Sequence, residues 1–346
     1  MFRGFWDKLD LPIIGLSPMD GVTDVAMREI SAIYGKPAVM LTEFVAAEGI
    51  AAGATKLLED FEYSEIQRPI VAQIFGKEPE AFRITAYVVA ALGFDGVDIN
   101  MGCPAKNVEQ HGSGAALIQT PEIAAQIIAK TKLGVEQFAG GMSPEEAGLP
   151  RKIIKKLRED KRFEIYFESA KLIPVSVKTR VGYDKPVTKE WISHLVAQDL
   201  ANISLHGRTL KQYYGGLADW DEIKIAAEIV HESGKGTTIL GNGDIANLKQ
   251  AHERIQMSKV DGVLIGRAAM GDPWVFVGKE VDYLTRLKVL VEHARIYEKF
   301  EGGGFFLPMR KHLAWYCKGF PGAAEARQKL VLCNSSTEVE EIISKL

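Results

Sequence analysis

One thiol of the sequence lies on a sharp turn, in the stretch GVDINMGCPAKNV at positions 96–108. The β-branched Val97 and Ile99 predict a buried strand, and Gly102 and Pro104 must end it. Cys103 therefore comes just after a strand end. Three roles are open to it: a buried structural thiol, a nucleophile activated to thiolate by a nearby base, or a general acid. A general acid needs the protonated form, which dominates at neutral pH for an unperturbed thiol pKa of ~8.5.

Candidate site residues, most of them with a hydrogen-bonding side chain, follow the apolar runs. They are Ser17, Pro18, Met19, Gln73, Asn100, Lys178, Arg180, His206, Asn242, Gly243, Asp244, Gly266 and Arg267. Lys178 and His206 could stabilise negative charge on a reduced ring cofactor, whereas either residue alone is more often a solvated lysine or a core histidine. Gln73 offers an amide suited to the edge of a heterocycle.

Glycines mark the last two of these positions, in GNGDI at 241–245 and IGRAAMGDP at 265–273. Glycine lets backbone N–H groups approach a phosphate, and a short helix after Arg267 could direct its N-terminus at the anion. Each glycine alone could simply close a tight turn, but the two positions together favour a phosphate site. No metal site is expected, because the sequence has no C-x-x-C pair and no clustered histidines.

The elements that must position these groups recur in a regular order. Short β-branched runs alternate with helical patterns such as 79–92 and 121–132, each opening on a proline. The eight runs span 12–18, 38–44, 68–76, 96–100, 173–180, 201–208, 236–244 and 261–268. Eight such units predict an α/β fold, a (β/α)8 TIM barrel, with functional groups at the carboxyl ends of its strands. The first turn lacks G-x-G-x-x-G, which argues against a Rossmann fold.

Two segments fall outside this repeat. We expect an insertion with its own helix at about 134–169, and a small all-helical C-terminal domain. The predicted domains are therefore a catalytic barrel at 1–278 and a helical domain at 279–346. The insertion carries a basic run whose side chains could extend an RNA-binding surface or belong to a solvated flap. The run comprises Arg151, Lys152, Lys155, Lys156, Arg158, Lys161 and Arg162.

Composition narrows the class of protein. The chain has 346 residues, 47% of them hydrophobic and 25% charged, with a net charge of −3, so it is globular and gives no overall basic signal. The three cysteines, of which Cys317 and Cys333 are expected to be structural, indicate a reducing compartment. No signal peptide is evident, and the longest apolar stretch, at 86–94, is too short to span a bilayer. A cytoplasmic protein is expected.

Taken in order, these motifs resemble those of the tRNA-dihydrouridine synthases, most closely the bacterial B-type branch. The similar stretches are LSPMDGVTD, TEFVAAEG, AQIFG, GFDGVDINMGCPAKNV, VSVKTR, ISLHGRT, ILGNGDI, DGVLIGRAAMGDPWVF and MRKHLAWYCKGFPGA. The resemblance implies an FMN-containing barrel and a helical domain that together clamp tRNA. It also implies NADPH-dependent reduction of one uridine, expected in the D-loop, to 5,6-dihydrouridine by a monomer.

The resemblance also implies roles for individual residues. Cys103 would be the proton donor. The cofactor-binding positions would be Ser17, Pro18 and Met19 against the flavin, Gln73, Lys178 and His206 around its ring system, and Asn242, Gly243, Asp244, Gly266 and Arg267 at its phosphate. Asn100, Arg180 and Tyr214 would contact the uracil. Basic groups expected to meet RNA phosphates in the tail are Arg310, Lys311, His312 and Lys318.

Two other functions remain open from the sequence. A dihydroorotate dehydrogenase-like reductase of a free pyrimidine would share the phosphate site and the acid. It would have no need of the tail motif RKHLAWYCKGFPG. A non-catalytic RNA-binding protein that has lost its flavin is the second alternative. The presence of Cys103, Lys178 and His206 argues against it.

Overall fold

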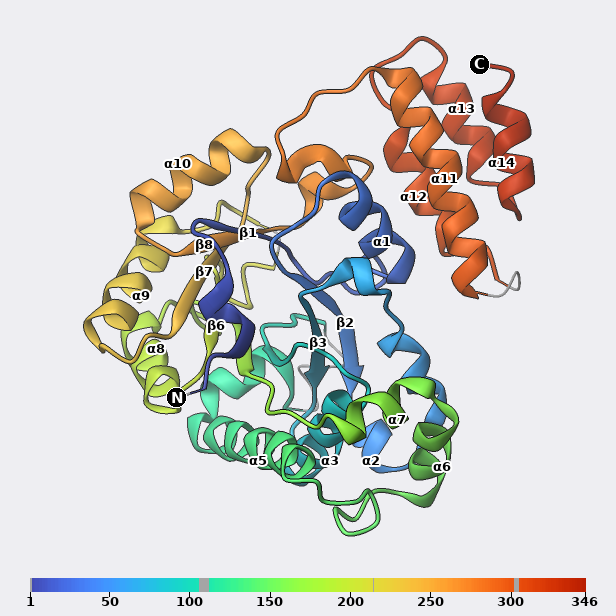
Figure 1. The fold of residues 1–346 in the computed structure, drawn as a ribbon. Helices are drawn as coiled ribbons and strands as arrows, with labels where there is room; N and C mark the ends of the chain where they lie inside the picture. The colour runs from blue at the N-terminus through green and yellow to red at the C-terminus, as the bar shows by residue number, and fades with distance from the viewer. Residues whose placement is uncertain (1, 106–111, 214, 302–304) are drawn as a thin grey trace.

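The centre of the structure, a computed structural model that describes residues 2–105, 112–213, 215–301 and 305–346, is a closed parallel barrel (Figure 1). Its strands pair in chain order, and β8 closes the barrel against β1. They are β1 (Ile13–Leu16), β2 (Met40–Ala46), β3 (Ile70–Phe75), β4 (Gly96–Met101), β5 (Val175–Arg180), β6 (Asn202–His206), β7 (Thr238–Asn242) and β8 (Gly262–Ile265). The predicted (β/α)8 barrel is therefore confirmed.

Helices surround the barrel, and their starts follow local sequence. Asp24 caps α1 by accepting a hydrogen bond of 2.8 Å from the backbone nitrogen of Met27, and α3 and α5 begin with Pro79 and Pro121. The helices packed around the strands include α1 (Val25–Tyr34), α2 (Ala47–Ala51), α3 (Pro79–Ala91), α5 (Pro121–Ala139), α8 (Thr188–Ala197), α9 (Trp220–Glu232) and α10 (Leu248–Ser258).

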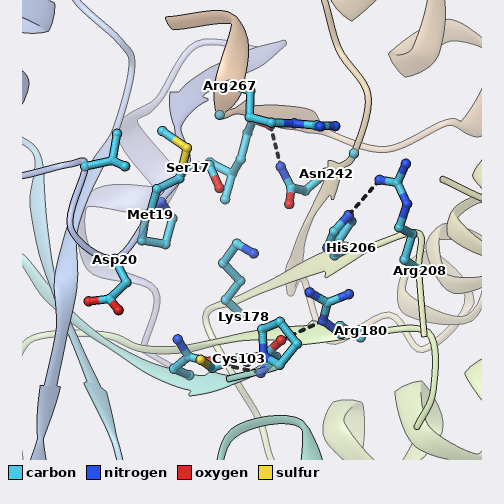
Figure 2. Close-up of a pocket in the computed structure, with 18 of the residues that line it drawn as sticks. Ser17, Met19, Asp20, Cys103, Lys178, Arg180, His206, Arg208, Asn242 and Arg267 are labelled. Carbon is cyan, nitrogen blue, oxygen red and sulfur yellow. Dashed lines mark hydrogen bonds between the residues drawn. The ribbon is translucent and has the colours of Figure 1, made fainter. Parts of the chain in front are cut away.

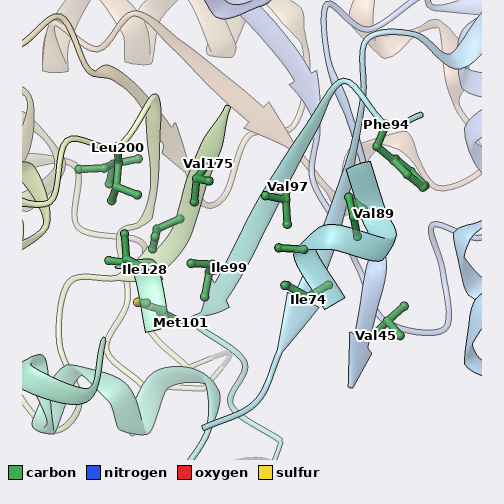
Figure 3. Close-up of a cluster of buried hydrophobic side chains, with 14 of the residues drawn as sticks. Val45, Ile74, Val89, Phe94, Val97, Ile99, Met101, Ile128, Val175 and Leu200 are labelled. Carbon is green, nitrogen blue, oxygen red and sulfur yellow. The ribbon is translucent and has the colours of Figure 1, made fainter. Parts of the chain in front are cut away.

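Side chains along each strand alternate between the helices and the barrel interior. In β4, Val97 and Ile99 belong to a buried hydrophobic cluster that includes Val89 of α3 and Ile128 of α5 (Figure 3). Because successive strand residues point to opposite faces, the residues between and after them, such as Asp98, face the interior. The same alternation turns the polar residues of the neighbouring strands toward the axis of the barrel.

The segment between β4 and β5 differs from the expectation. Helix α5 extends to Ala139, well beyond the predicted 132, because Phe138 still packs edge-on against Tyr87 of α3 at 5.5 Å between ring centroids. Gly134 does not end the helix: a Cβ there would lie 2.1 Å from the carbonyl oxygen of Arg83, so glycine lets α5 lie against α3. Two further helices follow, α6 (Arg151–Glu159) and α7 (Lys161–Glu168), rather than one.

A bundle of helices follows the barrel. It contains α11 (Tyr283–Glu301), α12 (Met309–Tyr316), α13 (Ala323–Leu330) and α14 (Ser336–Ile343) (Figure 1). Its hydrophobic core also takes in Ala26 and Ile30 of α1, so the bundle packs directly on the barrel's first helix. Within the described ranges, no helix has both the length and the apolar character needed to cross a membrane.

Candidate active site

A cavity of about 620 Å³ opens where the strands end. Every described residue that the sequence analysis placed in the site lines it. These are Ser17, Pro18, Met19, Gln73, Asn100, Cys103, Lys178, Arg180, His206, Asn242, Gly243, Asp244, Gly266 and Arg267. Tyr214 lies outside the described residues, and its neighbour Tyr213 lines the cavity. In Figure 2, Lys178 extends between the turn of Cys103 and the loops that carry Asn242 and Arg267.

The turn that carries Cys103 is held from two strands. Oδ1 of Asn100 accepts hydrogen bonds from the backbone nitrogens of Gly102, at 3.0 Å, and Cys103, at 2.9 Å. From β5, Nε of Arg180 donates to the carbonyl oxygen of Gly102 at 2.6 Å. Cys103 is 8% exposed, and burial raises the pKa of its thiol. This environment keeps the sulfur protonated at neutral pH, which favours a general acid over a nucleophilic thiolate.

Asn100 and Arg180 therefore position the turn beneath the cavity. Arg180 also donates to the carbonyl oxygen of Thr209 at 3.2 Å, which ties the turn to the loop after β6. Their contact with a target base, implied by the resemblance, stays a prediction. Both residues line the cavity as well, so the same side chains could hold the turn and meet a ligand.

A buried carboxyl group that the sequence analysis did not single out lies below these residues. Asp98 Oδ2 accepts a hydrogen bond of 2.8 Å from Gln73 Nε2, and Oδ1 accepts one of 2.7 Å from Ser176 Oγ. Gln73 Oε1 in turn accepts from Asn100 Nδ2 at 3.0 Å. Burial raises the pKa of Asp98 to about 6. The sequence did carry a signal, because Asp98 is two residues before Asn100 and must share its inward face.

Cationic side chains converge on the cavity from β5 and from the end of β6. Burial and, after it, the charge of Arg180 lower the pKa of Lys178 to about 8. Burial and, after it, the positive charges of Arg180 and Lys178 lower the pKa of His206 well below its ordinary value. Its ring is therefore neutral at neutral pH. Nη1 of Arg208 lies 3.4 Å from His206 Nε2, and because arginine only donates, the ring proton belongs on Nδ1. Arg208, which is 4% exposed, ends the strand run predicted at 201–208, but the sequence alone gave it no role.

The carboxylate of Asp244 holds two arginines of the cavity wall, Arg208 and Arg267. Its Oδ2 accepts from Arg208 Nη2 at 2.6 Å and from the backbone nitrogen of Ala218 at 2.8 Å, and Oδ1 accepts from Arg267 Nη2 at 2.8 Å. Burial raises its pKa, but the Ala218 N–H and Arg208 outweigh burial, and the net pKa is lowered. An ionised carboxylate repels phosphate, so this geometry suits the orientation of two arginines better than direct phosphate contact.

The two glycine loops differ in detail from the expectation. Gly243 has φ of +130° and a Cβ there would lie 2.5 Å from Ala218 Cβ, so this turn requires glycine. The short helix predicted after β8 is a single 3-10 turn, η5 (Arg267–Ala269). A turn of this length has little macrodipole. An anion at this point would therefore depend on the Arg267 guanidinium and on individual backbone N–H groups.

The predicted RNA contacts in the tail need one correction. His312 is 1% exposed, and its Nε2 lies 3.4 Å from Oδ2 of Asp24, so it joins α12 to α1 and does not meet solvent. Arg310 donates to the carbonyl oxygens of Cys333 and Leu332 at 2.9 and 3.1 Å. His312 was a wrong prediction because its helix turns that face toward the barrel. Lys311 and Lys318 remain candidates.

The described residues contain no group of three or more ligating side chains that could hold a metal ion.

Together, the fold and the site define a (β/α)8-barrel enzyme with a buried, protonated thiol and several cations around one cavity. The sequence model of the Dihydrouridine synthase (Dus) family matches residues 15–137 and 157–345. The chain therefore belongs to the dihydrouridine synthase family and is an oxidoreductase of that family, and the resemblance found from the motifs is confirmed.

Two bacterial relatives agree with this assignment. A probable tRNA-dihydrouridine synthase of Staphylococcus aureus (strain COL) is 32% identical over 352 residues, which cover 100% of this chain and 96% of the relative. Probable tRNA-dihydrouridine synthase 2 of Bacillus subtilis (strain 168) is 32% identical over 350 residues, 99% of this chain and 96% of the relative. Among solved structures, DHODH from Eimeria tenella in complex with ferulenol shares 12% identity and a TM-score of 0.49, over 84% of this chain and 85% of that chain.

Proposed function

We propose that the protein is a tRNA-dihydrouridine synthase that uses FMN and NADPH to reduce a D-loop uridine to 5,6-dihydrouridine. The observation that carries the proposal is the buried Cys103 thiol, whose pKa is raised by burial and which lines a cavity shared with Lys178 and His206. The family assignment and the tRNA-dihydrouridine synthases among its relatives support the choice of substrate.

The residues of the cavity fit an FMN molecule. The side chain of Lys178 has no ion pair or hydrogen bond with any residue that the structure describes, so its charge is available to a ligand that enters the cavity. Gln73 and Asn242 present amide groups, and Arg267 and Gly243 lie where a phosphate would be held. We assign Ser17, Pro18, Met19 and His206 to the remaining contacts with the ring system. When bound and reduced by NADPH, FMN would supply the hydride for C6 of the uracil.

The chain itself supplies the proton. As negative charge develops on the uracil, the S–H bond of Cys103 breaks and a C–H bond forms at C5, which completes the reduction of the C5–C6 double bond. The thiolate left behind is stabilised by Arg180 and Lys178, whose charges act on the Cys103 thiol and favour its ionised form. Solvent then returns a proton to the sulfur. Asn100 keeps the turn in place throughout, and Tyr214 is a further candidate contact for the base.

A uridine must leave the RNA stack to enter this cavity, at a cost of a few kcal/mol. Contacts between phosphates and basic side chains would offset that cost, and Lys311 and Lys318 are suitable groups beside the barrel. We therefore propose a catalytic domain at 1–278 and an RNA-binding helical domain at 279–346, acting as a monomer in the cytoplasm.

The test uses the purified full-length protein. We expect a yellow protein with flavin absorption bands. With NADPH it should add two hydrogens to tRNA from a strain lacking dihydrouridine, as measured by mass spectrometry of nucleosides. A colourless protein that takes up no FMN would contradict the proposal. Reduction of free uridine or orotate, with none of tRNA, would favour the free-pyrimidine reductase instead. Mapping the modified position in tRNA would test the D-loop assignment.

A further inference from the structure

We propose that Asp98 is a positioning residue that fixes the turn of Cys103 through Gln73 and Asn100. The side chains form one chain of hydrogen bonds inside the barrel: Asp98 to Gln73, Gln73 to Asn100, and Asn100 to the backbone nitrogens of Gly102 and Cys103. Asp98 and Gln73 are 0% exposed and Asn100 is 7% exposed, so water scarcely competes for these bonds. The geometry is independent of the proposed function, and only its importance for catalysis rests on that function.

The direction of this chain is determined at both ends. An ionised carboxylate only accepts hydrogen bonds, so Gln73 must turn Nε2 toward Asp98 and Oε1 toward Asn100. Backbone N–H groups only donate, so Asn100 must turn Oδ1 toward the turn and Nδ2 toward Gln73. One orientation of both amides satisfies every partner. A reversed amide would leave mismatched polar atoms in a buried place, which is unfavourable.

A different role for Asp98 would be that of a counter-charge for Lys178, since each charge acts on the other's ionisation. The two roles predict different results for conservative substitutions. Asp98→Asn removes the charge but keeps an oxygen for Gln73, because its amide nitrogen can donate to Ser176 Oγ. Gln73→Glu keeps the size of the side chain but places one carboxyl group against another, which breaks the chain of bonds.

The double variant Gln73→Glu/Asp98→Asn restores the chain with the two side-chain types exchanged. The amide introduced at position 98 would donate through its nitrogen to the carboxylate introduced at position 73, and its oxygen would accept from Ser176. That carboxylate would still accept from Asn100. The readout is hydrogen–deuterium exchange of the backbone amides of Gly102 and Cys103, measured on the full-length protein without substrate. This readout reports the turn directly and does not depend on turnover.

We expect Gln73→Glu to accelerate exchange of these two amides at least about fivefold, a typical size of coupling between contacting groups. The double variant should return to within about twofold of wild type, and Asp98→Asn alone should stay near wild type. Unchanged exchange in Gln73→Glu, or no recovery in the double variant, would overturn the proposal. Exchange in Asp98→Asn as fast as in Gln73→Glu would show that Asp98 acts through its charge, and would overturn the proposal as well. Loss of tRNA reduction with this exchange pattern intact would count against the proposed function alone.

A second observation concerns the insertion. The family model leaves out residues 138–156, which include most of helix α6. In α6 the apolar Ile153, Ile154 and Leu157 are buried, and all five basic side chains are exposed. The basic side chains are Arg151, Lys152, Lys155, Lys156 and Arg158. The first turn has two basic and no acidic residues, which the helix macrodipole disfavours, so the stability of the helix does not explain this sequence.

Helix α6 begins near the mouth of the barrel. Pro150 and Lys152 lie against Gly53, just after α2. Helix α2 is itself at the carboxyl ends of the strands, because Oε1 of its Glu48 accepts hydrogen bonds from the backbone nitrogens of Lys77 and Glu78, which follow β3. An RNA that covers the cavity could therefore reach the start of α6.

Only part of this basic face is neutralised within the protein. Arg158 pairs with Glu145 at 2.6 Å and Lys156 lies 4.0 Å from Glu159. Arg151, Lys152 and Lys155 have no ion pair with any residue that the structure describes. Resting on the proposed function, we infer that these three side chains bind the phosphate backbone of the tRNA substrate. This surface would be particular to chains that carry the insertion.

The test compares two triple variants with the same change in charge. One is Arg151→Glu/Lys152→Glu/Lys155→Glu. The control is Lys189→Glu/Lys224→Glu/Lys249→Glu, which changes exposed residues of α8, α9 and α10, on another side of the barrel (Figure 1). Binding of a fluorescent tRNA is measured over a series of salt concentrations.

We expect the α6 variant to bind at least about tenfold more weakly than the control at low salt. The slope of log K against log salt should become shallower by about two, near 0.7–0.9 for each lost phosphate contact. Equal binding and equal slopes for the two variants would show a solvated helix face and overturn the inference. If the wild type and the control also failed to bind tRNA, this result would contradict the proposed function and, with it, the inference about α6.

Discussion

The side-chain oxygen of Asn100 lies 2.9 Å from the backbone nitrogen of Cys103 and accepts its hydrogen bond. The same oxygen accepts from Gly102, so Asn100→Ala would leave two backbone donors without this partner. We expect this variant to lose about 2 kcal/mol of unfolding free energy and to turn over at least tenfold more slowly, since each unsatisfied buried donor costs about 1–3 kcal/mol. Urea denaturation and single-turnover reduction of tRNA measure the two effects. Wild-type turnover would show that the turn keeps its geometry without Asn100.

Replacing the thiol itself should separate chemistry from binding. In Cys103→Ala the proton donor is gone while the cofactor contacts remain, so we expect flavin content to stay at the wild-type level. Turnover should fall by about 10²–10⁴-fold, the usual contribution of a general acid. Flavin absorbance and dihydrouridine formation are the measurements. Cys333→Ala, in the helical core, is the matched control and should turn over normally. Equal rates in both variants would remove Cys103 from the reaction.

The pH dependence of turnover should reflect Lys178. Burial lowers its pKa to about 8, so the lysine is charged below pH 8 and loses its proton as the pH rises through this value. If its charge assists the reaction, the rate falls above about pH 8. In Lys178→Arg the charge persists, because arginine stays protonated, and the fall should move to a higher pH. The Cys103 thiol, whose pKa is raised, stays protonated further up the scale. Profiles of the same shape for wild type and Lys178→Arg would exclude this role.

Much of this site could be predicted because strand periodicity is a local property. Once 96–100 is a strand, Val97 and Ile99 must pack outward, and Asn100 must face the interior with Cys103 on the turn beyond it. Parallel strands then bring residues far apart in sequence, such as Lys178 and Asn242, to one end of the barrel. These predictions needed no knowledge of how the side chains pair.

The pairing of side chains could not be read in the same way. Asp98 was overlooked because its partners Gln73 and Ser176 belong to other strands, and only the closed barrel brings them together. The insertion was placed from about 134, although α5 continues through Gly134, where the close approach of α3 requires glycine. His312 was taken for an RNA contact because the sequence does not show which face of its helix meets α1.

Two lysines of the tail should contribute to RNA binding without affecting the barrel. Lys318 is exposed, and Nζ of Lys311 lies close to Gly21 in the loop after β1. We expect Lys311→Glu/Lys318→Glu to raise KM for tRNA severalfold at low salt with little change in kcat, and the difference to shrink as salt is added. Steady-state kinetics at two ionic strengths provide the measurement. A defect that persists at high salt would point to misfolding instead.

Buried histidine at the junction between the helical bundle and the barrel should make the fold sensitive to acid. Burial lowers the pKa of His293 to about 3, helped by the neighbouring His312. Between pH 6.5 and this value the unfolded chain binds a proton at His293 that the native protein does not. The unfolding free energy should therefore fall by about 1.4 kcal/mol for each unit of decrease in pH. Burial raises the pKa of Asp24, but its hydrogen bond with His312 and the charge of His312 outweigh burial and lower the pKa to about 2. Protonation of Asp24 therefore lowers the unfolding free energy further, but only below about pH 4.

Urea titrations at several pH values between 6.5 and 4.5 test this expectation. In His293→Asn the titrating group is absent, so we expect a shallower dependence on pH, even if the variant is less stable at pH 7. His252→Asn removes an exposed histidine of α10 and should leave the wild-type slope unchanged. Because the comparison is between slopes, a general loss of stability in His293→Asn does not affect it. Equal slopes in all three proteins would mean that His293 gains its proton in the folded state as readily as in the unfolded chain.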